Sequence, residues 1–368
     1  MRIRLAAIGL APMVLAVGAA AAQGWADEGL WEFRGETAEF QTYMGRRALH
    51  LKDALARLND LEFRDGVIEF DIAFPEQRGF VGLRFRVQEG GDFEEFYIRT
   101  HQSGNPDANQ YTPVFNGAYG WQIYYGERWS APIDYRFDEW MRFKAIVAGD
   151  RAEFYLDDEQ PFLHIDNLLT DNKSGAVELR ALFTDAYISN FRVSGLGDAQ
   201  LVGGPAPPPR APENVVRRWR VSGALEDRRA ASLSELPNGG LDEFEWRALD
   251  AEIHGIANLA RANARPEGRN TVLARVSVLS DRAQIKRFRF GFSDRVRVYV
   301  NGALLFDGDD AYLSRDYRHL GTVGFYDAIH APLIEGRNEI VLAVTEAFGG
   351  WAVAGAFDDL AGLQILAP

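Results

Sequence analysis

Residues 93–125 read FEEFYIRTHQSGNPDANQYTPVFNGAYGWQIYY, and this stretch contains the signals that decide the fold. It begins as a strand, because Phe96 and Ile98 alternate with Tyr97 and Arg99 on opposite faces. A loop rich in Ser, Gly, Asn, Pro and Asp follows, and an aromatic strand is expected to resume at Trp121. The alternation predicts a β-sheet with one buried face.

Polar and aromatic side chains are concentrated in and beside this loop. Amide and carboxylate groups can bond to sugar hydroxyls, and flat rings can cover the apolar C–H face of a sugar. The pattern therefore predicts a glycan-binding surface rather than establishing catalysis. The predicted ligand-binding residues are Tyr97, Arg99, His101, Asn105, Asp107, Asn109, Gln110, Tyr111 and Trp121.

From Trp25 to Leu61 the signals are mixed, but the same alternation recurs further along the first half. Residues 66–74 alternate until Pro75 ends the strand, and residues 81–87 alternate again. Residues 143–147 and 152–156 flank a Gly149-Asp150 turn, which indicates a hairpin. Many strands at regular spacing, each with one apolar face, predict two packed antiparallel sheets.

A Pro-rich segment, GGPAPPPRAP at 203–212, divides the chain. Beyond it, Val296, Val298 and Val300 run into Asn301-Gly302, a strong hairpin signal. The second half is therefore also expected to be all-β, as a jelly roll. The predicted domains are a β-sandwich at 25–200, a linker at 201–213 and a second sandwich at 214–368.

Residues 1–22 have the pattern of a signal peptide. Arg2 and Arg4 precede a short apolar core at 5–17, and Ala20 and Ala22 fit small-residue cleavage before Gln23. The chain is therefore expected to be exported, to the periplasm or the extracellular space; an uncleaved membrane anchor is the rival interpretation. The sequence has no cysteine, so its domains hold without disulfides.

Charge and motif content exclude several classes of function. The formal net charge is −13, which makes nucleic acid an unsuitable partner. No G-x-S-x-G, H-E-x-x-H or P-loop sequence occurs. The six histidines show no spacing typical of metal ligands.

The first half resembles a concanavalin A-like lectin/glucanase domain of the laminin-G type over residues 30–195. The resemblance is carried by GVIEFD at 66–71, GLRFR at 82–86, AEFYLD at 152–157 and ISNFRV at 188–193. It implies a curved two-sheet jelly roll with a ligand at its concave face or rim. The second half, over 215–366, resembles a galactose-binding-like jelly roll through GFSD at 291–294, VYVNG at 298–302 and EGRNE at 335–339.

Catalysis would require two placed carboxylates. Some glucanases of the concanavalin-like fold carry them as E-x-D-x-(x)-E, and Glu69 and Asp71 match the opening pair. Ala73 and Phe74 stand where the third acid should be, so the motif is incomplete. The candidate catalytic residues are Glu69, Asp71, Asp107 and His101. The alternative for Glu69 and Asp71 is ion pairing on the sheet face with Arg84, Arg86 or Arg99.

Asp107 and Asn109 are the candidate metal ligands. Oxygen-rich loops can bind Ca²⁺ with backbone carbonyls, although Asx residues also form turns without a metal. No cofactor is required by the pattern, and the loop can accommodate Ca²⁺.

These observations lead to an exported carbohydrate-binding protein as the first hypothesis, with a glycan or polysaccharide as partner. A glycoside hydrolase or related sugar-active enzyme is the second hypothesis. The third is a structural surface or adhesion module that binds a cell-surface protein.

Overall fold

The structure is a computed structural model that describes residues 24–208, 210–227, 241 and 244–367. The predicted signal peptide lies outside these residues. Every element with described bounds is a β-strand, except the 3₁₀-helices η2 (Glu28–Leu30) and η3 (Leu259–Arg261). The prediction of an all-β chain is therefore confirmed. Among the described residues, no helix is long and apolar enough to cross a membrane.

The first half forms a ten-stranded sheet around one long strand, β10 (Ala176–Ser194). The start of β10 pairs with β4 and its end pairs with β3, while its other edge pairs with β2. A shift of register between Ala181 and Asp185 marks a β-bulge where β10 turns from one part of the sheet to the other. The order is β6-β5-β4-β10-β3-β7-β8-β9, with β2 and β1 on the remaining edge of β10.

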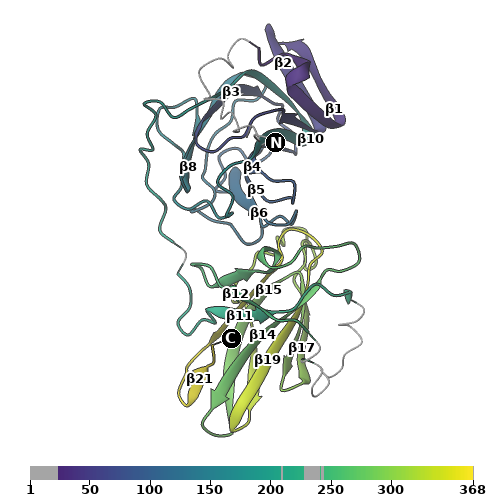
Figure 1. Ribbon diagram of the computed structural model, residues 1–368, viewed down its shortest axis with the longest axis vertical. Coiled ribbons are helices and arrows are strands. Elements are labelled where there is room, and N and C mark those ends of the chain that lie inside the picture. Colours follow the sequence, from purple (N-terminus) through teal and green to yellow (C-terminus); the bar gives the residue numbers. More distant parts are fainter. Residues whose placement is uncertain (1–23, 209, 228–240, 242–243, 368) are drawn as a thin grey trace, which may run out of the picture.

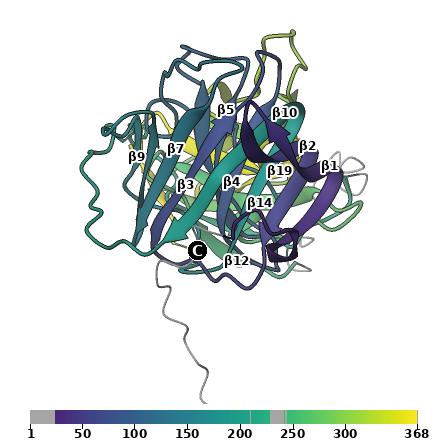
Figure 2. The same cartoon turned by 90° about the horizontal axis from the view of Figure 1, so that it is seen from above.

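The bounds of the other strands in this half are β1 (Trp31–Tyr43), β2 (Arg46–Leu58), β3 (Gly66–Ala73), β4 (Phe80–Val87), β5 (Phe93–Arg99), β6 (Asn109–Val114), β7 (Met141–Ala148), β8 (Arg151–Leu156) and β9 (Leu163–Ile165). The hairpin expected around Gly149-Asp150 is β7–β8. Figure 2 shows β10 running across the sheet, with β4 and β3 along one edge and β2 along the other.

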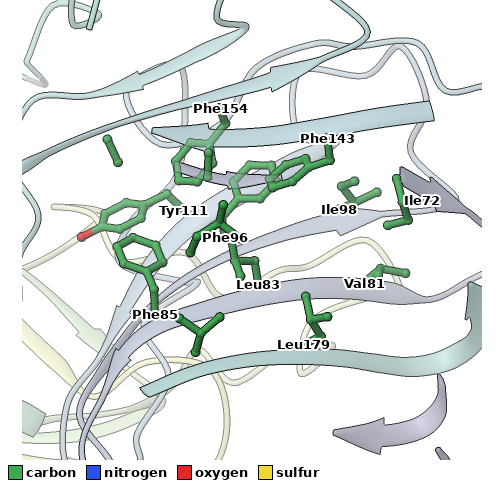
Figure 3. Packing of buried hydrophobic residues seen from close by; sticks show 14 of the residues in the cluster. Ile72, Val81, Leu83, Phe85, Phe96, Ile98, Tyr111, Phe143, Phe154 and Leu179 are labelled. Carbon is green, nitrogen blue, oxygen red and sulfur yellow. The ribbon is translucent and has the colours of Figure 1, made fainter. Parts of the chain in front are cut away.

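The two parts of this sheet pack face to face through aromatic rings. Phe96 on β5 lies 4.3 Å from Phe154 on β8 and 5.5 Å from Phe143 on β7, measured between ring centroids. Figure 3 shows these rings together with Leu83 and Leu179 in one continuous core. The alternating residues of β3, β4 and β5 supply the core side chains, which makes this half a sandwich.

The described residues of the second half form a seven-stranded sheet and a four-stranded sheet. Their orders are β12-β11-β14-β19-β16-β17, with β21 beside β14, and β13-β20-β15-β18. Trp219, Trp351 and Phe288 are fully buried in the core of this half. The expected hairpin at Asn301-Gly302 joins β16 to β17, and both turn residues have positive φ, 49° and 89°.

The bounds of the strands in the second half are β11 (Arg218–Val221), β12 (Arg247–Asp250), β13 (Ile256–Asn258), β14 (Thr271–Ser280), β15 (Gln284–Ser293), β16 (Arg295–Val300), β17 (Ala303–Asp309), β18 (Asp327–Leu333), β19 (Gly336–Thr345), β20 (Ala352–Phe357) and β21 (Leu363–Ile365). In Figure 1 the two halves form separate bodies, and the chain that connects them runs along one side. Near the start of this connection, the backbone N–H groups of Val202 and Gly203 donate to Glu153 in the first half.

Candidate functional site

The segment at 120–125, part of the stretch predicted to bind glycan, lies where the two halves meet. Gln122 is fully buried there, and its backbone N–H donates to the Gly349 carbonyl at 3.1 Å. Its side-chain Nε2 donates to the Leu320 carbonyl at 2.8 Å, and its Oε1 accepts from the Ser293 hydroxyl at 2.9 Å. Its own carbonyl accepts from Val323 N–H at 2.9 Å. The first half is thus hydrogen-bonded to two loops of the second half and to the last residue of β15.

The prediction that an aromatic strand resumes at Trp121 is wrong. The strand in this region is β6, which ends at Val114, and residues 121–124 form turns. The physical reason is that the backbone around Gln122 bonds to loops of the second half instead of to a neighbouring strand. Trp129, in the turns that follow, is buried, with 4% of its surface exposed.

Three aromatic rings from three separate segments meet at this junction, and we call Trp121, Tyr312 and Phe348 the junction cluster. The Trp121 ring lies 5.7 Å from Tyr312 and 5.8 Å from Phe348, and the last two rings are 5.9 Å apart. Phe348 is 57% exposed, whereas the other two are half-buried. The cluster therefore presents aromatic surface to solvent.

Arg78 and His101 adjoin the junction cluster from the first half. The Arg78 guanidinium donates to the Tyr312 hydroxyl at 3.4 Å, and the next residue, Gly79, donates its N–H to His101 Nδ1 at 3.4 Å. Burial, followed by the positive charge of Arg78, lowers the pKa of His101. His101 is therefore neutral at pH 7, and because Nδ1 accepts, its proton is on Nε2, which can donate to a ligand.

The turn after His101 places two more of the predicted residues at the surface. Asn105 is exposed, and its amide donates to the Gln102 side chain at 2.6 Å. Asp107 is half-buried, and its backbone carbonyl accepts from Arg99 at 2.8 Å. His101, Asn105 and Asp107 thus bring an imidazole, an amide and a carboxylate to one short turn.

Other predicted ligand-binding residues are engaged with protein groups behind this surface. Gln110 is 1% exposed; its Oε1 accepts from the Tyr97 hydroxyl at 2.6 Å and from Arg99. Its Nε2 donates to the carbonyls of Trp121, at 2.9 Å, and Tyr124. Tyr97, Arg99 and Gln110 therefore hold the segment that carries Trp121 against the sheet.

Tyr111 and Asn109 lie in the interior. Tyr111 is fully buried, and its hydroxyl donates to Glu94 at 2.5 Å. Asn109 is also fully buried, and its side chain bonds in both directions to the backbone of Ala131. Both side chains form hydrogen bonds within the protein, and these bonds hold neighbouring segments in place.

Glu69 and Asp71 lie on the sheet face away from the core, each beside an arginine. Arg142 lies 2.5 Å from Glu69, and Arg46 lies 2.5 Å from Asp71. The expected pairing with Arg84, Arg86 or Arg99 is wrong, because β3 lies between β7 and β10 and not beside β4. The structure does support the interpretation that these acids form ion pairs on the sheet.

Two structural observations bear on the metal prediction. Among the described residues, no group of three or more His, Asp or Glu side chains is arranged to hold a metal ion. Asn109 uses both its amide nitrogen and its oxygen on Ala131. Ca²⁺ binding by Asp107 and Asn109 stays a prediction.

Tyr312, Phe348 and Arg78 belong to the site although the sequence patterns did not single them out. Tyr312 and Phe348 lie in loops of the second half, and alternation within strands says nothing about which loops meet. One signal was present: Phe348 precedes Gly349-Gly350, and a side chain on Gly349 would meet Gln122 and Trp121 within 2.7 Å. Such a glycine marks the close approach of another segment.

Comparison with known proteins gives weak likenesses. No family model matches the chain, and no curated protein matches. A carbohydrate-binding module, CBM66 from Bacillus subtilis, is 15% identical with a TM-score of 0.35, covering 45% of this chain and 96% of the module. A putative glycosyl hydrolase from Parabacteroides distasonis is 14% identical with a TM-score of 0.34, covering 48% and 92% of the two chains.

The β-glucanase of Bacillus licheniformis is a third solved structure of this kind. It is 13% identical with a TM-score of 0.32, and the match covers 45% of this chain and 92% of the glucanase. Since these TM-scores lie below 0.5 and the identities below 25%, the likenesses do not show what this chain binds.

Proposed function

We propose that this chain binds carbohydrate at the junction cluster and at the adjoining turn that bears His101, Asn105 and Asp107. The observation that carries the proposal is the gathering of Trp121, Tyr312 and Phe348 at the surface. Their rings can cover the apolar face of a sugar, while the neighbouring polar groups bond to its hydroxyls.

The polar groups around the cluster suit neutral sugar hydroxyls. Neutral His101 offers an N–H donor, Asn105 offers a donor and an acceptor, and Asp107 offers an acceptor. Arg78 adds a cation that is exposed and already oriented by its contact with Tyr312. A sugar has polar hydroxyl groups and an apolar C–H face, and donors and acceptors beside aromatic rings can bind both.

The wider setting of the proposal follows from the sequence. The chain is exported to the periplasm or beyond, where glycans and polysaccharides are accessible, and it needs no cofactor. A cell-surface glycoprotein is a suitable partner, because its glycan would present the same chemistry. Nucleic acid does not suit a chain with a net charge of −13.

A glycan array on the secreted full chain tests the proposal, with and without EDTA. Phe348→Ala is the test variant, because this ring is 57% exposed and its loss leaves the core intact. Removal of one stacking ring should weaken binding about tenfold. Tyr317→Ala is the matched control, since Tyr317 is an 82% exposed aromatic of a neighbouring loop whose ring contacts Arg318.

Selective glycan binding that falls in Phe348→Ala and persists in Tyr317→Ala supports the proposal. Equal binding by all three proteins places the site elsewhere, and absence of binding by wild type refutes carbohydrate recognition. EDTA sensitivity would assign a metal to the site. Analysis of the same glycans for released sugars tests the hydrolase alternative.

A further inference from the structure

A second group of rings adjoins the junction cluster, and we call Phe80, Phe183 and His101 the bulge cluster. The ring centroids of Phe80 and Phe183 are 6.3 Å apart, and those of Phe80 and His101 are 5.7 Å apart. Both pairs are edge-to-face, an arrangement favoured by aromatic rings. Phe183 lies in the β-bulge of β10, and Phe80 begins β4.

Phe183 is unusual in both exposure and backbone conformation. Its side chain is 65% exposed, and its φ is +59°, in the left-handed region that bulky residues rarely adopt. The conformation is held from β2, where the Asp53 carboxylate accepts the Phe183 N–H at 2.8 Å. Asp53 itself has a φ of +44°.

An exposed aromatic residue at such a position has no advantage for folding. A glycine would adopt the same backbone without steric cost, and a polar residue would not expose apolar surface to water. Strained residues of this kind concentrate at ligand-binding sites, where the surrounding structure enforces them. The conformation and exposure of Phe183 together indicate that its ring is presented to a ligand.

A short turn connects the two clusters. The Gln77 side chain donates to the hydroxyl of Thr184, the residue after Phe183, at 2.9 Å. The next residue, Arg78, reaches Tyr312 in the junction cluster. The polar side chains of Gln77, Arg78 and His101 thus lie between the exposed rings of Phe183 and Phe348.

We infer that the binding site extends from the junction cluster over residues 77–80 to Phe183, and that it takes a glycan chain of several sugar units. The inference rests on the proposed function. Because Phe80, Arg78 and Tyr312 intervene, one sugar ring cannot contact both Phe183 and Phe348. Aromatic surface at both ends with polar groups between suits a chain whose sugar faces stack at the ends and whose hydroxyls bond in the middle.

The test is calorimetric titration of the full chain with cello-, laminari-, xylo- and malto-oligosaccharides of one to six units. For the series that binds, affinity should rise at least tenfold from two to six units. Phe348→Ala should weaken both the dimer and the hexamer, whereas Phe183→Ala should weaken the hexamer five- to tenfold and leave the dimer unchanged. Ile285→Ala removes a 68% exposed side chain on β15 and serves as control.

Phe183→Gly separates binding from folding. Glycine relieves the positive φ, so this variant should keep or raise the unfolding temperature while it loses the same hexamer affinity. Equal affinity for dimer and hexamer, or a hexamer affinity unaffected by both Phe183 variants, overturns the extended site and leaves the proposed function intact. Absence of binding by wild type to every oligosaccharide overturns both.

Discussion

Glu346 is a carboxyl group enclosed in the second half, and its ionisation is expected to lower the stability of the protein at alkaline pH. It is 2% exposed and lies between the end of β19 and the loop that carries Phe348. Burial, followed by the nearby negative charge of Asp294, raises the pKa of Glu346 from 4.5 to about 8. Arg265, 3.6 Å away, opposes this rise only in part.

The sign and size of the effect follow from linkage. The native protein keeps the proton of Glu346 up to about pH 8, whereas the unfolded chain releases it near 4.5. The native state is therefore favoured by this group below pH 4.5, and the contribution is lost as the pH rises through 8. A pKa difference of this size corresponds to about 5 kcal/mol in the free energy of unfolding.

Glu346→Gln tests this reasoning, because glutamine keeps the shape of the side chain and does not ionise. Urea unfolding of both proteins at intervals from pH 4.5 to 8.5 gives the difference between their free energies of unfolding. The difference should move by about 5 kcal/mol in favour of the variant across this range. Other titrating groups cancel in the difference, and two parallel profiles would refute the assignment.

Three further perturbations have defined outcomes. His254 is buried with both ring nitrogens unpaired, and burial lowers its pKa to about 4. The difference in free energy of unfolding between wild type and His254→Phe should therefore move by about 3 kcal/mol in favour of the variant as the pH falls from 6.5 to 4, measured by urea unfolding. Gln122→Ala leaves the Leu320 carbonyl without the side chain that donates to it, while the Ser293 hydroxyl keeps Asp294 as acceptor at 3.1 Å, and the change should cost about 1–3 kcal/mol in the same assay. Phe96→Ala opens a cavity among stacked core rings and should cost about 3–5 kcal/mol, visible as a lower unfolding temperature.

Strands with two pairing partners could be predicted from the sequence. In β3, Ile68, Phe70 and Ile72 are buried on one face, and this strand was expected at almost its observed bounds. β1 gave mixed signals for a physical reason. It pairs only with β2 at the edge of the sheet, and only Trp31 and Phe40 of its residues are buried, so its sequence has little alternation.

Within the candidate site, the sequence predicted the polar side chains of the turn after His101. It did not predict the residues of the second half that lie beside this turn. His101 and Asn105 were expected in or beside a loop, and both lie in the loop between β5 and β6. Tyr111 and Gln110 have the same polar and aromatic character, but β6 is buried along its whole length. Composition alone cannot distinguish a side chain that contacts a ligand from one that supports the loop behind it.

The loop that begins at Glu346 connects the stability of the second half to the geometry of the proposed binding surface. Asp294 accepts the backbone N–H groups of Ala347 and Phe348, at 2.5 Å and 2.7 Å, and so fixes the segment that presents the Phe348 ring. The carbonyl of Gly349, one residue later, accepts from Gln122 in the first half. A single short loop therefore positions one ring of the junction cluster and fastens the segment that carries another. The bonds of Asp294 therefore help to hold together the proposed site, to which both halves of the chain contribute.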